Sequence, residues 1–338
     1  MQEALYYIQD YKHEKNLVQC VLCPRKCVIQ DGTIGYCNVR QNVNGKLFSL
    51  VYGKAAALQV DPIEKKPLFH FLPGTKVFSL GTVGCNLRCK FCQNFHTSQT
   101  KPGEYREIEI PPREIVELAA EHGCNSIATT YNDPIIFYEY VLDIFKEARN
   151  KGIKTVMVSN GFICEEPLRE IMNYMDAINV DLKGFSNKFY GSVTSAWLSP
   201  ILDTLKILHN SKVWFEVTNL IIPTLNDSDE EIMKMCRWIL ENIGDEHPLH
   251  FTGFHPDYQM KNLPSTSRET LLRAYKIAKD IGLKYVYVGN VMSGNAENTY
   301  CHKCNVLLIE RHGYSIEKMN IVDGKCMFCK ERIHGVFD

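Results

Sequence analysis

From about residue 77 onward, the chain alternates between two patterns of hydrophobic and polar positions. Short apolar runs rich in β-branched residues predict strands at residues 77–82, 126–130, 155–159, 177–181, 213–222, 249–254 and 285–288. Between these runs, apolar residues recur at helical spacing, as at Ile232, Met235 and Ile239. Six or seven such units predict an α/β fold with a parallel sheet and right-handed crossovers, in the form of a partial (β/α)6 TIM-like barrel. A flat, doubly wound sheet is the alternative.

The two ends of the chain do not carry this pattern. Residues 1–76 are rich in cysteine and contain a predicted hairpin at residues 46–60, followed by a proline-rich connection. Residues 299–338 consist of short predicted strands between two Cys-x-x-Cys corners. We therefore expect three segments: a Cys-rich N-terminal extension (1–76), the partial barrel (77–298) and a ribbon-like C-terminal segment (299–338).

Charge and hydropathy exclude two classes of partner. The chain has 38 basic and 39 acidic residues, so it lacks the basic excess of a nucleic-acid-binding protein. No apolar run approaches the roughly 18 residues that a membrane span needs, and the first residues are too polar for a signal peptide. We therefore expect a cytoplasmic protein that binds neither nucleic acid nor membrane.

Cysteine is the unusual residue, with 14 in 338 positions. This frequency is below that of disulfide scaffolds, and clustered cysteines in a reducing compartment indicate metal binding. The groups are Cys20, Cys23, Cys27 and Cys37, then Cys85, Cys89 and Cys92, and finally Cys301, Cys304, Cys326 and Cys329.

The central group follows the first predicted strand of the barrel with the spacing Cys-x3-Cys-x2-Cys. Three thiolates from one short loop can hold three irons of a [4Fe–4S] cluster and leave the fourth iron open. A zinc site would need a fourth ligand, which His96 could supply. The position at the carboxyl end of a barrel strand, where barrels place their chemistry, favours the cluster.

With the aromatic Phe91 directly before Cys92, this motif resembles the signature of the radical S-adenosylmethionine (SAM) superfamily. The resemblance implies that the open iron binds the amino and carboxylate groups of SAM. It further implies that one electron cleaves SAM to methionine and a 5′-deoxyadenosyl radical, which removes hydrogen from a substrate. Such an enzyme is an oxygen-sensitive oxidoreductase that works under anaerobic conditions.

Further motifs narrow the resemblance to one branch. They are Asp61-Pro62-Ile63-Glu64-Lys65-Lys66-Pro67-Leu68, Cys92-Gln93-Asn94, Thr130-Tyr131-Asn132-Asp133-Pro134, Val158-Ser159-Asn160-Gly161, Val180-Asp181-Leu182-Lys183-Gly184 and Tyr287-Val288-Gly289-Asn290. Together they resemble the radical enzyme of the AmmeMemoRadiSam system, a relative of pyruvate formate-lyase activating enzymes.

That branch implies hydrogen abstraction from a protein or peptide, an electron donor such as flavodoxin or ferredoxin, and partner proteins of the Memo and AMMECR types. The chain departs from activating enzymes in one respect, because it contains no Gly-Gly-Glu segment; residues 129–134 stand in its place. Two alternatives therefore stay open: a radical SAM enzyme acting on a small molecule, and a non-catalytic iron–sulfur or zinc scaffold.

The resemblance also assigns cofactor-binding residues at the ends of the second and third predicted barrel strands. Asp133, with Asn132 as its neighbour or substitute, would accept hydrogen bonds from the ammonium of SAM. The alternative description of Asp133 is the N-cap of an Asp-Pro helix start, and both descriptions can hold together. Ser159 and Asn160 would reach the methionyl carboxylate or the ribose, although a Ser-Asn-Gly turn has the same sequence.

Polar residues on the next two predicted strands extend this site. Asp181 and Lys183 share one face by period-2 spacing, and in activating enzymes such an Asp is associated with a monovalent cation. A structural salt bridge would have the same spacing. Glu216 lies among apolar residues, and we expect it to point into the barrel. His255 and Tyr258, after the strand at 249–254, are candidates for substrate contact.

The two outer cysteine groups differ in spacing. The pairs Cys301–Cys304 and Cys326–Cys329 are typical of a zinc ribbon, so structural zinc is favoured there over an iron–sulfur cluster. The N-terminal group, Cys20-x2-Cys23-x3-Cys27-x9-Cys37, suits zinc and an auxiliary iron–sulfur cluster equally well.

Overall fold

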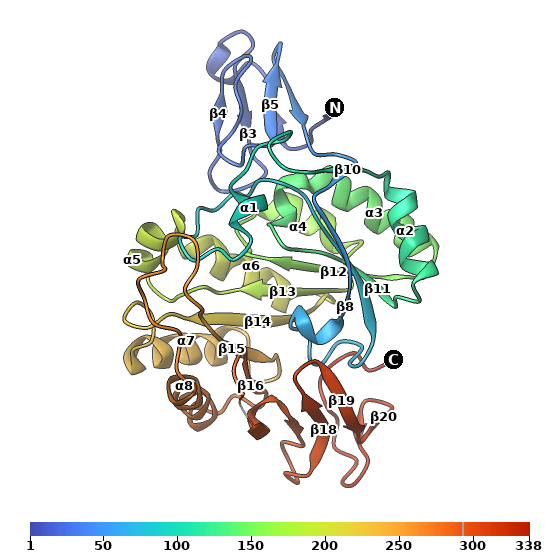
Figure 1. Ribbon diagram of the computed structural model, residues 1–338, viewed down its shortest axis with the longest axis vertical. Helices are drawn as coiled ribbons and strands as arrows, with labels where there is room; N and C mark the ends of the chain where they lie inside the picture. Colours follow the sequence, from blue (N-terminus) through green and yellow to red (C-terminus); the bar gives the residue numbers. More distant parts are fainter. Residues whose placement is uncertain (293) are drawn as a thin grey trace.

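The computed structural model describes residues 1–292 and 294–338 (Figure 1). Three regions follow one another along the long axis of the molecule. The N-terminal region lies at one end, a barrel-like α/β region occupies the middle, and the C-terminal region lies at the opposite end (Figure 1). Within the described residues, no helix combines the length and the apolar character needed to cross a membrane.

The middle region is organised around an eight-stranded sheet with the order β16-β15-β14-β13-β12-β11-β9-β8. All strands except β8 run parallel to their neighbours. Their bounds are β8 (Ala57–Pro62), β9 (Lys76–Gly81), β11 (Ser126–Thr129), β12 (Lys154–Ser159), β13 (Ala177–Asp181), β14 (Trp214–Ile221), β15 (Leu249–Gly253) and β16 (Val286–Gly289).

The order of the parallel strands in the sheet follows their order in the chain. A doubly wound sheet would instead reverse its strand order at a switch point. The topology therefore confirms the partial barrel as an open, mainly parallel (β/α) sheet, and every strand that the hydrophobic pattern predicts is present within two residues. The strand interiors are buried on both faces, as a sheet covered by helices requires.

Helices connect successive parallel strands and cover the outer face of the sheet (Figure 1). They are α2 (Pro112–Glu121), α3 (Tyr138–Asn150), α4 (Glu165–Met172), α6 (Ser199–His209), α7 (Asp229–Asn242) and α8 (Arg268–Ile281), with the short α1 (Phe95–Ser98) and α5 (Asn187–Phe189). Several begin at a side-chain cap: Ser228 accepts from the backbone of Glu231 at 3.3 Å and Ser267 from that of Thr270 at 3.2 Å. Gly282, with φ of 113°, ends α8.

The N-terminal region corrects the prediction of a hairpin at residues 46–60. The hairpin joins β5 (Arg40–Val43) to β6 (Lys46–Ser49). Asn44 and Gly45 form its turn with φ of 51° and 82°, which is the conformation that an Asn-Gly pair adopts in two-residue hairpin loops. Residues 57–62 instead form β8, which joins the central sheet as an antiparallel neighbour of β9.

The remaining N-terminal strands are short and pair with one another or with the barrel. They are β1 (Gln2–Glu3) on β6, β2 (Tyr7–Ile8) and β4 (Val28–Ile29) on either side of β3 (Val18–Cys20), and β7 (Lys54–Ala55) on β10 (Ile108–Glu109).

The C-terminal region consists of small antiparallel sheets around a core of its own. Its strands are β17 (Thr299–Tyr300), β18 (Leu307–His312), β19 (Ser315–Met319), β20 (Ile321–Val322) and β21 (Lys325–Cys326). Leu308, Ile309 and Cys326 pack there with Tyr285 and Tyr287 from the barrel edge.

Candidate active site

The central cysteines lie on the loop between β9 and α1, at the end of the sheet where the parallel strands finish (Figure 1). Cys85 and Cys89 are buried and Cys92 is partly buried. Backbone hydrogen bonds from Arg88 to the Thr194 carbonyl (2.9 Å) and from Lys90 to the Val193 carbonyl (3.0 Å) hold the loop. The protein itself thus fixes the shape of the loop, as a preformed ligand site requires.

The spacing of these three sulfurs fits a cluster better than a single ion. Among the described residues, only the C-terminal cysteines form a set of three or more His, Cys, Asp or Glu donors within 4.8 Å of one another. The alternative zinc site that would combine the central cysteines with His96 is therefore not formed. In an iron–sulfur cube each thiolate binds a different iron, so the sulfurs lie farther apart than around one metal ion.

Burial and the charge of a neighbouring residue shift the pKa values of these thiols in opposite directions. Burial raises the pKa of Cys89 to about 12 and also raises the pKa of Cys85, while the Lys183 ammonium lowers the pKa of Cys89 and of Cys92. Thiolates at this site therefore need a cation to be stable, and metal coordination supplies one.

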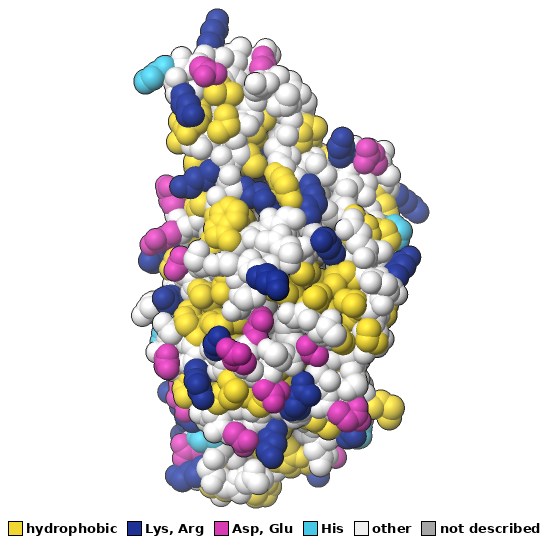
Figure 2. Space-filling view, turned by 90° about the vertical axis from the view of Figure 1, so that its left-hand side faces the viewer, with side chains coloured by type: hydrophobic (Ala, Val, Ile, Leu, Met, Phe, Trp, Pro, Cys, Tyr) yellow, Lys and Arg dark blue, Asp and Glu magenta, His cyan; other side chains and the backbone are white. Residues whose placement is uncertain are grey.

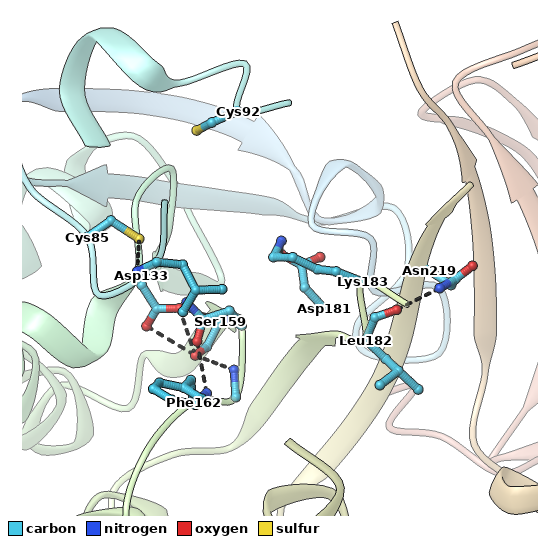
Figure 3. Close-up of polar contacts among 12 residues, drawn as sticks. Cys85, Cys92, Asp133, Ser159, Phe162, Asp181, Leu182, Lys183 and Asn219 are labelled. Atoms are coloured by element: carbon cyan, nitrogen blue, oxygen red, sulfur yellow. Dashed lines mark hydrogen bonds and ion pairs between the residues drawn. The ribbon is translucent and has the colours of Figure 1, made fainter. Parts of the chain in front are cut away.

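Asp133 lies beside Cys85 and receives hydrogen bonds from three neutral donors. Its carboxylate accepts from the backbone of Asn160 at 2.7 Å, from the backbone of Ile135 at 3.1 Å and from the Ser159 hydroxyl at 3.2 Å. Figure 3 shows Asp133 and Ser159 gathered on the side of Cys85 that faces the sheet. The helix-start description of Asp133 is correct, because the bond from Ile135 is the cap of the turn that follows.

The charge of Asp133 has no contacting cation among the described residues. The side chain is 4% exposed, and burial raises its pKa above the ordinary value of 3.8, to about 6. Lys183 opposes this increase only through its charge at a distance. A buried carboxylate beside the cluster loop would therefore be stabilised by an added ammonium, which is the group that SAM presents.

Asn132 and Asn160 use their side-chain amides to shape the site. Asn132 accepts from the backbone of Thr82 at 3.1 Å and donates to the Gly84 carbonyl at 2.9 Å, so it holds the start of the cysteine loop. Asn160 donates to the side chain of Asn86 at 2.8 Å. These contacts give both residues a positioning role, and direct cofactor contact stays a prediction.

Asp181 and Lys183 come together at the end of β13, across from Asp133 (Figure 3). The Lys183 ammonium lies 2.9 Å from the Asp181 carboxylate and 5.6 Å from the centre of the Phe91 ring. The salt bridge that the spacing allowed is therefore present. A monovalent cation at Asp181 would share this carboxylate with Lys183, and that site stays a prediction.

Glu216 points into the barrel, as expected, but its partners lie away from the cysteine loop. The carboxylate accepts from the backbones of Phe69 (2.9 Å) and His70 (2.7 Å), and it pairs with His250 at 2.6 Å and with Trp214 at 3.1 Å. These contacts fix the segment around Phe69 inside the barrel. They give Glu216 a structural role and lend no support to its assignment as a cofactor residue.

Two residues that sequence reasoning missed or left open belong to the site. Asn86, inside the cysteine motif, is fully buried and donates to the Phe162 carbonyl at 3.1 Å. Its position between two ligand cysteines was the available signal. Tyr258 stacks on Phe95 of α1 with ring centres 4.6 Å apart, which places the segment after β15 against the cysteine loop. His255, by contrast, is exposed.

A cavity opens at the ends of β14, β15 and β16. It has a volume of about 340 Å³ and is lined by Thr218, His250, Asn290 and the carboxylates of Glu64 and Glu297, among others. Within the described residues, the Thr218 hydroxyl and one oxygen of Glu64 are buried without a hydrogen-bond partner. Such unpaired groups are exceptions to the rule that buried polar atoms have hydrogen-bond partners.

Fold and site together define a class: a partial (β/α) barrel with a three-cysteine loop after its first parallel strand. The sequence profile of the radical SAM superfamily matches residues 79–239, which include this loop. The chain is 44% identical over 335 residues to the uncharacterized protein MJ0808 of Methanocaldococcus jannaschii, covering 98% of this chain and 99% of that protein.

More distant relatives extend the comparison. The pyruvate formate-lyase-activating enzyme of Clostridium pasteurianum is 23% identical over 211 residues, covering 59% of this chain and 88% of that enzyme. The crystal structure of Streptococcus suis SuiB bound to S-adenosylmethionine shares the fold, with a TM-score of 0.51 at 14% identity, covering 69% of this chain and 54% of SuiB. The chain belongs to the radical SAM superfamily and is distantly related to activating enzymes.

Proposed function

We propose that this radical SAM enzyme abstracts hydrogen from a protein or peptide substrate, as the radical enzyme of an AmmeMemoRadiSam system. The observation that carries the radical SAM chemistry is the buried Asp133, which contacts no cation among the described residues. It lies beside a loop whose three cysteine sulfurs are not all within 4.8 Å of one another. The protein substrate is supported by the distant relationship to pyruvate formate-lyase-activating enzymes.

Each residue of the site has its own role in this proposal. Cys85, Cys89 and Cys92 would hold a [4Fe–4S] cluster, which supplies the electron that cleaves SAM. Asp133 would accept the ammonium of SAM, and Ser159 holds that carboxylate at 3.2 Å. Lys183 balances the negative charge of the cysteine loop. Burial of Cys85, Cys89 and Asp133 inside the partial barrel would keep water from a reactive intermediate.

The electron donor and the partner proteins are part of the same proposal. Figure 2 shows the face at which the parallel strands end. Lys and Arg side chains gather with hydrophobic ones in the middle of this face, and acidic side chains lie mainly below them (Figure 2). Such a surface suits an acidic electron carrier of the flavodoxin or ferredoxin type. Memo-type and AMMECR-type proteins are the proposed further partners, in the cytoplasm.

Formation of 5′-deoxyadenosine tests the proposed chemistry. The protein is reconstituted with iron and sulfide without oxygen, then mixed with dithionite and SAM, and the nucleoside is measured by chromatography. We expect wild type to form 5′-deoxyadenosine and Cys89→Ala to form none. The matched control is Cys236→Ala, which removes a fully buried thiol of α7 away from the loop. An inactive wild type with a full cluster would contradict the proposal and favour a metal scaffold.

A small-molecule substrate is the second candidate, and the cavity at Thr218 and Asn290 favours it. Its volume of about 340 Å³ lies within the range of small-molecule sites, and its lining includes the polar residues Thr218, His250 and Asn290. Extract from cells grown in heavy water distinguishes the candidates, because hydrogen abstraction transfers deuterium to 5′-deoxyadenosine. Label from the dialysed protein fraction supports the first candidate, and label from the low-mass filtrate alone supports the second.

A further inference from the structure

The four C-terminal cysteines have the sulfur–sulfur distances that are expected around a single metal ion. All four sulfurs lie within 4.8 Å of one another, with Cys301 and Cys329 3.5 Å apart and Cys304 and Cys326 3.8 Å apart. A tetrahedral zinc with Zn–S bonds of about 2.3 Å places its sulfurs roughly 3.8 Å apart. The C-terminal group therefore fits structural zinc.

The sulfurs of the N-terminal cysteines are not this close together, although the four residues share one pocket. Cys20, Cys23, Cys27 and Cys37 all line the same pocket, but no three of their sulfurs come within 4.8 Å of one another. The free volume between them is about 20 Å³. A cluster entering this pocket must push the thiols outward, whereas a zinc ion would have to draw them together.

The walls of the pocket suit a buried iron–sulfur cluster. Leu22, Ile29 and Ile135 supply apolar walls, and Arg25 and Arg40 also line the pocket. Arg40, which is 1% exposed, donates to the Cys20 sulfur at 3.5 Å. Hydrogen bonds to the sulfurs and exclusion of solvent are the means by which proteins stabilise and tune such clusters.

The pocket also adjoins the loop of the central cysteines. Asn86 lines it, and the Arg25 side chain donates to the Asn86 carbonyl at 2.5 Å. Gly84 has φ of 85°, and a Cβ atom there would lie 2.5 Å from the Cys37 carbonyl. The backbone of the central loop thus rests directly on the N-terminal cysteine loop.

We propose that Cys20, Cys23, Cys27 and Cys37 hold a second [4Fe–4S] cluster, adjacent to the central one, and that the C-terminal group alone holds zinc. Three features carry this inference: a pocket lined by four cysteines of which no three have their sulfurs within 4.8 Å of one another, its apolar walls with a buried arginine donor, and its contact with the central loop. The inference does not depend on SAM cleavage or on the proposed substrate.

Metal content of a variant without the central ligands tests the proposal. In Cys85→Ser/Cys89→Ser/Cys92→Ser, purified and reconstituted without oxygen, we expect about four irons, about four labile sulfides and about one zinc per chain. Mössbauer spectra should show a [4Fe–4S] cluster. Two zincs and no iron, or no metal at the N-terminal group, would overturn the proposal. Deoxyadenosine formation is not needed for this result, so the failure of either proposal can be distinguished.

A second variant tests the proposal even if the triple variant does not fold. Cys37→Ser keeps the central cysteines and is expected to lower iron from about eight to about four atoms per chain. The matched control, Cys124→Ser/Cys236→Ser, removes two buried thiols outside the three groups and should keep about eight irons. Unchanged iron in Cys37→Ser, together with loss of one zinc, would contradict the second cluster.

Discussion

The two outer cysteine groups have the same four ligands but are built into the molecule differently, at opposite ends of the barrel (Figure 1). Cys20 and its three neighbours pack into the large hydrophobic core that fills the barrel. Cys301 and Cys326 belong to a separate small core shared with Phe69 and Tyr287. The N-terminal group is thus continuous with the active-site region, whereas the C-terminal group lies in a module at its edge.

This difference teaches that ligand identity alone does not determine the metal. Four thiolates are compatible with both zinc and iron–sulfur clusters. What separates the groups is how far the surrounding elements hold the sulfurs from one another, and which charges and apolar walls surround them. Three changes test whether the N-terminal region is part of the core and the C-terminal region an independent module, and a fourth tests the barrel mouth between them.

The largest effect is expected from Arg40→Ala in the N-terminal region. The Arg40 guanidinium pairs with Glu139 of α3 and also donates to the Leu5 carbonyl at 3.1 Å. Removing it leaves the 4%-exposed Glu139 as a buried, unpaired charge, which costs about 3–5 kcal/mol. Guanidinium unfolding followed by tryptophan fluorescence measures this loss.

The double variant Arg40→Met/Glu139→Leu serves as the control for this change. Because it removes both charges and keeps most of the buried volume, it should recover most of the lost free energy of unfolding. A cost of less than about 1 kcal/mol for Arg40→Ala would show that the N-terminal region is not anchored in the core by this pair.

The barrel mouth between the two groups should respond to pH through Asp133. Its pKa in the folded protein is about 6, above the ordinary value of 3.8, so the folded state favours the protonated form. This contribution to stability is complete below pH 4 and is lost as the pH rises through 6. The difference of about two pKa units corresponds to roughly 3 kcal/mol.

Urea unfolding of the metal-free protein between pH 4 and 7.5 measures this effect as the difference between wild type and Asp133→Asn. A difference is needed because burial lowers the pKa of His70 and of His247 to about 4, which acts in the opposite direction over the same range. If both proteins lose or gain stability in parallel, Asp133 is not the titrating group.

Cys304→Ser should destabilise the C-terminal region and leave the barrel unchanged, because it removes one of the four proposed zinc ligands. Loss of zinc would remove about 2.7 kcal/mol of stabilisation at free zinc a hundred times its dissociation constant. In hydrogen exchange, we expect β18 and β19 to lose protection while β12 and β13 keep theirs, because the module has its own core. Equal loss in the central strands would contradict the independence of the C-terminal region.

The smallest effect is expected from Lys303→Ala at the surface of the same module. Lys303 lies 2.8 Å from Glu331, but its side chain is 62% exposed. Such pairs contribute about 0–1 kcal/mol and weaken with salt. Thermal unfolding at low and at high salt concentration measures the contribution of this pair to stability. A larger loss would mean that surface charge, and not metal, holds the module.

The sequence by itself determined much of the barrel and of the cysteine loop. Short apolar runs located every parallel strand because each strand buries both of its faces, one against the outer helices and one in the barrel interior. The Cys85–Cys92 spacing identified the superfamily because the three ligands of the cluster come from one local loop. The Asp181–Lys183 pair could also be predicted, because period-2 spacing on one strand places both side chains on one face.

Only the tertiary structure decided the features that join distant parts of the chain. Glu216 meets Phe69, 147 positions earlier, and Arg40 meets Glu139, 99 positions later. β8 pairs with the edge strand β9 of the central sheet, a pairing that the sequence pattern did not indicate. Our proposal of a cluster at the N-terminal group and zinc at the C-terminal group likewise rests on how packing holds the sulfurs apart in space. Spacing along the chain limits that distance but does not set it, because loops of the same length close into different shapes.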